Sequence, residues 1–121
     1  MKDVYIYDAI RTPRGKGRKD GALHEVSALN LATSVLNEIK SRNTLEGHAV
    51  EDVILGNVTQ VGEQGACLAR TAVLNSDLDE AIPGLAINRF CASGLVSRRR
   101  SYWYRVEHEC YFYWWCNGYC N

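Results

Sequence analysis

Strand-like and helix-like segments alternate along most of the chain, and this alternation limits more than any other feature what the chain can fold into. Short apolar runs at 4–10, 53–58 and 85–90 have the length and composition of buried strands. Two segments between them, 28–42 and 66–75, carry apolar residues at helical spacing. The order β-α-β-α-β predicts an α/β fold with right-handed crossovers and a mostly parallel sheet.

The two predicted helices differ in how they begin and in what they bury. Ser27 offers an N-cap to the first, whose apolar stripe consists of Ala28, Leu31, Ala32, Val35, Leu36 and Ile39. The second is rich in alanine, and its small residues suit close packing against another helix or chain. Pro83 and Gly84 then end the connection that leads into the last predicted strand.

The average composition excludes several classes of protein. The chain is 46% hydrophobic and 23% charged with a formal net charge of zero, so nothing favours a nucleic-acid or anionic membrane partner. No apolar run reaches the roughly 20 residues that span a bilayer. Asp3 and Asp8 interrupt the apolar N-terminus, which argues against a signal peptide. We expect a cytoplasmic or matrix-type location.

The composition changes abruptly near residue 96, and we divide the chain there into a domain, 1–96, and a tail, 97–121. The tail holds nine of the 12 aromatic residues, and its apolar side chains follow neither a helical nor a strand period. We therefore expect it to be irregular. It also holds three cysteines and a histidine, which match no standard zinc spacing: Cys110, Cys116, Cys120 and His108. A metal site or a redox role is the less favoured reading, and we expect no metal.

The loop 11–22 carries five basic residues and three glycines. Its Gly-x-Gly fragment lacks a third glycine and opens no helix, so a solvated surface or a contact with an anionic group is favoured over a phosphate cradle. A nucleic-acid binder is a weaker alternative, resting on this loop and on the tail, where Arg98, Arg99, Arg100 and Arg105 lie among stackable rings. Residues 1–96 carry ten basic against twelve acidic side chains and no recognised binding module, which argues against it.

Cys91 lies where the third predicted strand ends and a helix is expected to begin. Unpaired amides at a helix start carry positive partial charge and favour a thiolate, the nucleophilic form of cysteine. Ala92, Ser93 and Gly94 are small and leave the sulfur open to a bulky electrophile, and the Cys91 amide can donate to a developing oxyanion. The alternative is that Cys91 is a small buried apolar residue. Cys67 starts the weaker second helix with no strand leading into it, so it is a poorer candidate.

Three segments resemble the N-terminal domain of the thiolases: DAIRTPRGKGRKDGAL, VEDVILGNVTQVGEQGACLAR and AINRFCASGL. The resemblance covers residues 1–95 nearly without a gap. It implies the N-terminal, incomplete part of a mixed sheet and a role for Cys91 as the nucleophile that becomes an acyl thioester. It further implies acyl-CoA and CoA as substrates, no other cofactor, a homo-oligomer, and a place in acyl-CoA metabolism such as fatty acid β-oxidation.

The chain departs from the family pattern at three points. VSRRR follows CASGL where family members continue with small residues, and Cys67 stands where they commonly have Asn or Asp. The family's later motifs, Asn-Glu-Ala-Phe, Gly-His-Pro and Cys-x-Gly-Gly, are absent from these 121 residues, and His24 and His48 lie outside any family motif. We therefore expect an N-terminal part of a thiolase-type acyltransferase that lacks its acid/base residues and is inactive by itself.

A shifted reading frame after the CASGL codons would account for the tail, because Trp, Tyr, Cys and Arg clusters without periodicity are typical of out-of-frame sequence. The alternative to the acyltransferase is a non-catalytic fragment that is unstable or that only associates with intact thiolase subunits.

Overall fold

The computed structural model describes residues 6–16, 18–46, 49–100 and 110–115. Within these ranges seven elements follow one another along the chain. They are α1 (Ala28–Asn43), β1 (Val50–Gly56), the 3-10 helix η2 (Gly62–Gln64), α2 (Leu68–Leu74), β2 (Gly84–Ile87), α3 (Ser93–Arg100) and β3 (Cys110–Trp115).

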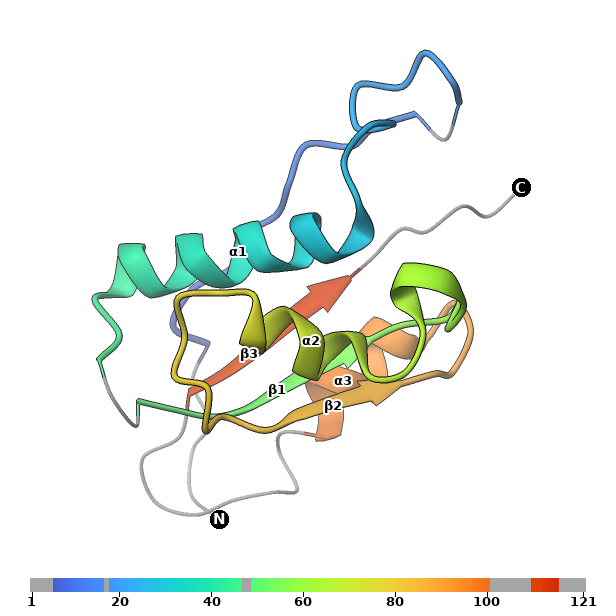
Figure 1. The fold of residues 1–121 in the computed structure, drawn as a ribbon. Coiled ribbons are helices and arrows are strands. Elements are labelled where there is room, and N and C mark those ends of the chain that lie inside the picture. The colour runs from blue at the N-terminus through green and yellow to red at the C-terminus, as the bar shows by residue number, and fades with distance from the viewer. Residues whose placement is uncertain (1–5, 17, 47–48, 101–109, 116–121) are drawn as a thin grey trace.

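The three strands form one parallel sheet in the order β2-β1-β3 (Figure 1). Val53 of β1 is in register with Gly84 of β2 on one side and with Phe112 of β3 on the other. The helices α2 and α3 come directly before and after β2 in the chain. The α/β class and the parallel pairing predicted from the alternation are confirmed.

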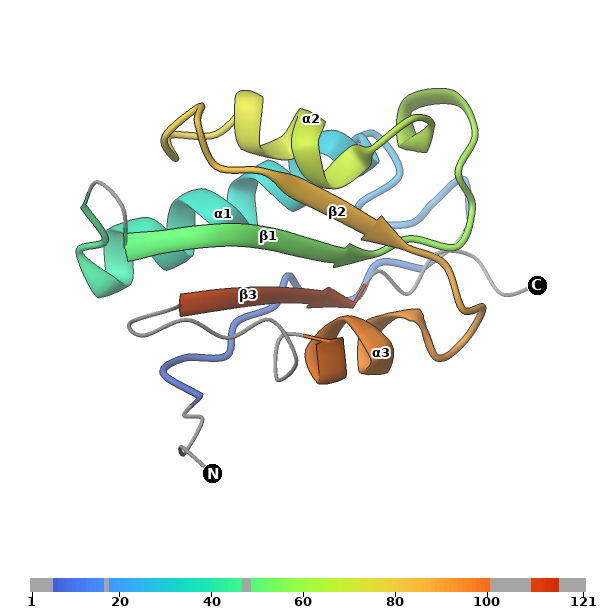
Figure 2. The same cartoon turned by 90° about the horizontal axis from the view of Figure 1, so that it is seen from below.

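The helices cover both faces of the sheet (Figure 2): α1 and α2 lie on one side and α3 on the other. Val53 and Leu55 of β1 point into the main core with apolar residues of α1 and α2, among them Leu36 and Val73. Ile54 lies between them in sequence, is 1% exposed, and faces the α3 side because successive strand residues alternate. β1 is thus the central strand, buried on both faces.

Helix α1 begins and ends with side-chain and backbone caps. The Ser27 hydroxyl accepts a hydrogen bond from the Asn30 amide at 3.1 Å, which confirms the predicted N-cap. At the other end Thr44 adopts a left-handed conformation, and its amide donates to the Lys40 and Ser41 carbonyls. The predicted stripe is buried at Ala32, Val35, Leu36 and Ile39.

Strand β2 packs closely against α2. A side chain at Gly84 would place its Cβ 2.4 Å from the Arg70 amide nitrogen, so only glycine permits this approach. The sequence predicted close packing of the second helix against another helix or chain, and the close approach that glycine requires is to the strand β2. β2 ends at Ile87, three residues earlier than predicted, because the Asn88 side chain bonds to neighbouring backbone and turns the chain away from the sheet.

The predicted first strand is wrong over its described part. Residues 6–10 have no regular secondary structure, and the side chains of Ile6 and Tyr7 are largely exposed. Both edges of β1 are paired, with β2 and with β3, so no edge of that strand is left for this segment. Asp8 instead accepts a hydrogen bond from Asn43 at 3.1 Å and lies 3.6 Å from the Arg42 guanidinium. Residues 4 and 5 lie outside the described part.

The tail is more regular than predicted. Helix α3 continues to Arg100 and crosses the boundary drawn at residue 96, and β3 forms at Cys110–Trp115. Arginine is a good helix former, so the run after Ser97 prolongs the helix. Aromatic residues favour strands, and β3 pairs with the edge of β1 that β2 does not occupy. Residues 101–109 and 116–121 are outside the described part. In the described ranges no helix is long and apolar enough to cross a membrane.

Candidate active site

Cys91 occupies the connection between β2 and α3, as the sequence predicted. It follows the last residue of β2, Ile87, by four positions and precedes the first residue of α3, Ser93, by two. Its thiol is free and the residue is exposed. Cys91 therefore lies at the carboxyl edge of a parallel sheet, where open α/β folds bind their ligands.

A glycine contact brings the start of α3 against the sheet. A side chain at Gly56, the last residue of β1, would place its Cβ 2.6 Å from the Gly94 nitrogen and 2.7 Å from the Ser93 carbonyl carbon. Both are backbone atoms that have no room to move aside, so the close approach requires glycine at this position. The end of β1 thereby fixes where α3 begins, and with it the place of Cys91.

The turn before α3 is stabilised by its own backbone. The Ala92 amide donates to the Arg89 carbonyl and the Ser93 amide to the Phe90 carbonyl, each at 3.0 Å. Phe90 has a φ of 48°, in the left-handed region that non-glycine residues rarely adopt. The residue that carries the thiol thus directly follows a strained backbone position.

The side chains of Ser93 and Asn88 form hydrogen bonds on both sides of this strained residue. The Ser93 hydroxyl accepts from the Arg89 amide at 2.8 Å and donates to the Phe90 carbonyl at 2.7 Å. The Asn88 side-chain oxygen accepts from the Phe90 amide, and its nitrogen donates to the Val58 carbonyl, each at 3.0 Å. The peptide groups on both sides of Phe90 are therefore held by side chains that flank the turn.

Asn57 joins the ends of the two neighbouring strands. Its amide donates to the Ile87 carbonyl at 2.9 Å, and its side-chain nitrogen donates to the Gln64 carbonyl at 2.9 Å. The residue is 2% exposed, so these bonds replace those that water would otherwise make. Asn57 fixes the loop after β1 beside the turn that carries Cys91.

The start of α3 provides a positively polarised surface near the thiol. The first hydrogen bond of the helical ladder runs from Val96 to the Ala92 carbonyl at 2.9 Å. The amides that precede Val96 form the positive end of the helix dipole, although those of Ala92 and Ser93 already donate within the turn. The amides of Gly94 and Leu95, which start this helix, carry the remaining partial positive charge.

The other predicted thiol and imidazole groups lie elsewhere or outside the described part. Cys67 caps α2, is half-buried, and donates to the Gly84 carbonyl with an S–O distance of 3.3 Å, which fits a structural role. His24 is exposed and pairs with Glu25 at 2.8 Å. Cys110 lies in β3, while His48, His108, Cys116 and Cys120 fall outside the described ranges. Among the described residues no three potential metal ligands gather.

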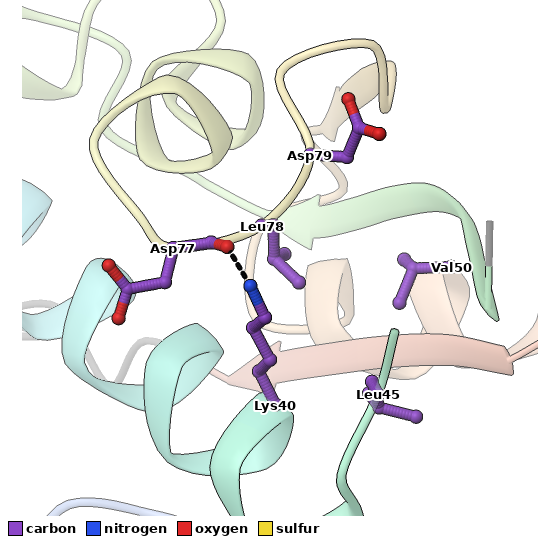
Figure 3. A pocket seen from close by; sticks show the side chains of 6 residues that line it. All are labelled: Lys40, Leu45, Val50, Asp77, Leu78 and Asp79. Atoms are coloured by element: carbon purple, nitrogen blue, oxygen red, sulfur yellow. Dashed lines mark hydrogen bonds between the residues drawn. The ribbon is translucent and has the colours of Figure 1, made fainter. Parts of the chain in front are cut away.

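A shallow pocket lies at the other end of the sheet (Figure 3). It is lined by the end of α1, the start of β1 and the loop after α2, and Lys40 donates to the Asp77 carbonyl at its rim. Val50, the first residue of β1, belongs to its lining, whereas Cys91 follows the last residues of the parallel strand β2. The pocket is therefore separate from the thiol.

Sequence reasoning missed the polar residues that hold the turn: Asn57, Asn88 and Ser93. The signal was present, because each asparagine directly follows an apolar strand and Ser93 opens the helix. Asn and Ser at such joints commonly bond to nearby backbone.

The comparison with protein families gives one match that covers most of the chain. The model described as "Thiolase, N-terminal domain" matches residues 4–99. The matched range contains every element described above except β3 and the last residue of α3.

Individual relatives agree with this match. A 3-oxoadipyl-CoA/3-oxo-5,6-dehydrosuberyl-CoA thiolase of Escherichia coli is 44% identical over 96 residues, and a 3-ketoacyl-CoA thiolase of Cronobacter sakazakii is 40% identical over 96 residues. Each alignment covers 78% of this chain and 23% or 24% of the relative, so the chain spans about a quarter of their length. The crystal structure of the Bacillus anthracis acetyl-CoA acetyltransferase matches with a TM-score of 0.60 and 37% identity, over 67% of this chain and 20% of that one.

Proposed function

The chain belongs to the thiolase family, and from that premise we propose that it carries the nucleophile of a thiolase-type acyltransferase, with Cys91 as the residue that becomes acylated. One observation carries the assignment of the residue. Cys91 presents an exposed thiol at the strand–helix joint between β2 and α3, inside the range that matches the family.

The proposed first step is an acyl transfer to sulfur. The Cys91 thiolate attacks the thioester carbonyl of an acyl-CoA, a carbon–sulfur bond forms, and the CoA thiolate leaves and takes up a proton. With a 3-ketoacyl-CoA the attack falls on the 3-keto carbon, the bond between carbons 2 and 3 breaks, and the acetyl-CoA carbanion is protonated. In either case a second thiol or carbon nucleophile then removes the acyl group and regenerates the cysteine.

The surroundings of Cys91 support this chemistry. The positive end of α3 favours the oxyanion that develops on the attacked carbonyl. Ala92 and Gly94 place no large side chain beside the sulfur. Acyl-CoA and CoA are the substrates, and no other cofactor is required for these steps. The names of the relatives refer to 3-ketoacyl, 3-oxoadipyl and acetyl groups, so they do not single out one acyl group for this chain.

We further propose that the described chain supplies the nucleophile without the groups that move the protons. The only described histidine, His24, is exposed and paired with Glu25. Repeated turnover needs a base within hydrogen-bond reach of the thiol and a donor for the leaving carbanion, whereas a single acylation needs only the exposed thiol. The homo-oligomeric state remains a prediction from the resemblance, and the cytoplasmic or matrix-type location remains one from the sequence.

Acylation of the 121-residue polypeptide tests the assignment. The polypeptide is incubated with acetyl-CoA, and the acetylated residue is identified by peptide mass spectrometry after quenching. We expect one acetyl group at Cys91, none in Cys91→Ser, and an unchanged yield in Cys67→Ser, which removes the other described thiol outside β3. Acetylation of Cys67 as fast as Cys91 in the folded polypeptide would show that Cys91 has no special reactivity.

A second candidate function is association without catalysis. Several large apolar side chains are exposed, among them Val61 at 67%, Phe90 at 77% and Leu95 at 69%. Exposed apolar surface of this kind favours binding to another protein surface. Co-purification with a full-length thiolase subunit, combined with no acetylation at Cys91, would favour this reading over the acyltransferase.

A further inference from the structure

We infer that Ser93 and Asn88 are positioning residues for the Cys91 thiol, holding the turn in the one conformation that aims the sulfur at an acyl-CoA carbonyl. The inference rests on the proposed function, because it concerns the residue that becomes acylated. Neither side chain touches the reacting atoms in the proposed step. Both act through the backbone of Phe90, the residue directly before the nucleophile.

The Ser93 hydroxyl uses both of its hydrogen-bonding abilities inside the turn. It accepts from the Arg89 amide at 2.8 Å and donates to the Phe90 carbonyl at 2.7 Å. Ser93 is 4% exposed, so its hydroxyl makes both bonds from a buried position. Removing the oxygen would take the acceptor from the Arg89 amide and leave the Phe90 carbonyl with only its bond from the Ser93 amide, so the turn would be held less tightly.

The conformation of Phe90 explains why hydrogen bonds to two side chains are needed. Its φ of 48° is unfavourable for a residue with a Cβ, and such positions persist only when the surroundings determine them. The Phe90 side chain is 77% exposed, so side-chain packing contributes little to holding it. Besides the backbone bond from the Ser93 amide to its carbonyl, Phe90 is held by its amide donating to the Asn88 side chain and by its carbonyl accepting from the Ser93 hydroxyl.

A change at Phe90 is passed directly to Cys91. If Phe90 relaxes to a negative φ, the following peptide unit rotates and the thiol points in another direction. Small displacements of a reacting atom lower rates steeply, by up to about a hundredfold for a shift of roughly 1 Å. A small, mobile electrophile is less sensitive to the direction of the sulfur than a bulky acyl-CoA.

Ser97 provides a matched control one turn further along α3. It is also a buried serine, 0% exposed, and its hydroxyl donates to the Ser93 carbonyl at 2.9 Å. Its hydrogen bond is of the ordinary helical kind and reaches no residue between Asn88 and Ala92. Loss of this hydroxyl therefore removes a buried hydrogen bond in the same helix and leaves the side-chain hydrogen bonds of Ser93 and Asn88 in place.

The experiment measures two rates at Cys91 in the 121-residue polypeptide, acetylation by acetyl-CoA and alkylation by iodoacetamide, by peptide mass spectrometry. The half-buried Cys67 in the same molecules reports on the fold. We expect Ser93→Ala and Asn88→Ala to slow acetylation of Cys91 about tenfold or more. Alkylation of Cys91 stays within about threefold of wild type. Ser93→Thr, which keeps the hydroxyl, recovers most of the acetylation rate, and Ser97→Ala stays at the wild-type rate.

The outcomes separate this inference from the proposed function. Wild-type acetylation of Cys91 in folded Ser93→Ala and Asn88→Ala overturns the positioning role and leaves the proposed function intact. Equal losses of acetylation and alkylation, or the same loss in Ser97→Ala, overturn it as well, because they indicate a general structural effect. If Ser93→Ala unfolds, as faster Cys67 labelling would report, the exposed Asn88→Ala decides by the same criteria. Absence of Cys91 acetylation in the wild type overturns the proposed function, and the positioning role with it.

Discussion

At the scale of single residues, the chemistry of this chain depends on where a thiol is held rather than on the thiol itself. Two cysteines of the matched domain lie near helix starts, Cys67 before α2 and Cys91 before α3. Only Cys91 is exposed, while Cys67 donates to a strand carbonyl. The sequence predicted the place of Cys91 because an apolar run ends there. It did not predict the hydrogen bonds of the Asn88 and Ser93 side chains, because they depend on distances between residues of the folded turn.

Asp52 offers a prediction at the same scale. Its Oδ1 is buried and has no hydrogen-bond partner among the described residues. Burial raises the pKa of this carboxyl above its usual 3.8, and a hydrogen bond from the Val53 amide opposes the rise. The folded state thus binds a proton more tightly than the unfolded state, so the stability linked to Asp52 is lost as the pH rises through this raised pKa.

We expect Asp52→Asn to be more stable than wild type at pH 7, because it removes the buried charge. The difference should shrink toward zero as the pH falls well below 3.8, where both the folded and the unfolded wild type are protonated at Asp52. Denaturant unfolding at several pH values measures it. Asp20→Asn removes an exposed carboxylate and should leave the free energy of unfolding unchanged at every pH measured. A constant gain for Asp52→Asn across the pH range would contradict the assignment to ionisation.

At the scale of elements, local patterns predicted the segments whose partners are close in sequence. The apolar stripe and cap of α1 are local signals, and so are the apolar runs of β1 and β2. The prediction of a strand at 4–10 was wrong because a strand needs a neighbouring strand to pair with, and both edges of β1 are already paired. β3 was missed for the converse reason: aromatic residues without a period form a strand where an edge is available.

Gly56 provides the prediction for this scale. Gly56→Ala would drive a Cβ into the backbone of Gly94 and Ser93, and we expect it to displace α3 and to destabilise the fold by about 1–3 kcal/mol. Gly84→Ala meets the backbone of α2 on the other face and serves as the matched control. Hydrogen exchange should accelerate in α3 for the first variant and in α2 for the second. Equal acceleration of both helices in Gly56→Ala would indicate global loosening instead.

At the scale of the whole molecule, one central strand organises three layers around the candidate site. β1 packs on α1 and α2 with one face, meets α3 with the other, and positions the start of α3 through Gly56 (Figure 2). This part of the thiolase fold therefore contains what is needed to build the strand–helix joint. The chain spans about a quarter of the length of the relatives named above.

The last prediction follows from the difference between acylation and turnover. We expect the 121-residue polypeptide to accept one acetyl group at Cys91 and to show no sustained CoA-dependent cleavage of acetoacetyl-CoA. Acylation needs the exposed thiol and the polarised start of α3, which act locally. Turnover also needs a base for the thiol and a proton donor for the leaving carbanion, and general acid–base catalysis contributes roughly a factor of 100 to 10,000 in rate.

Absorbance of the acetoacetyl-CoA enolate follows the cleavage, with the full-length Escherichia coli relative as the positive control and Cys91→Ser as the blank. The expected trace follows the blank throughout, because the first cleavage already releases the acetyl-CoA carbanion that needs the proton donor. Continued turnover that disappears in Cys91→Ser would contradict the prediction. It would mean that groups within these 121 residues move the protons, and the tail, with His108 and its three cysteines, would be the first segment to substitute.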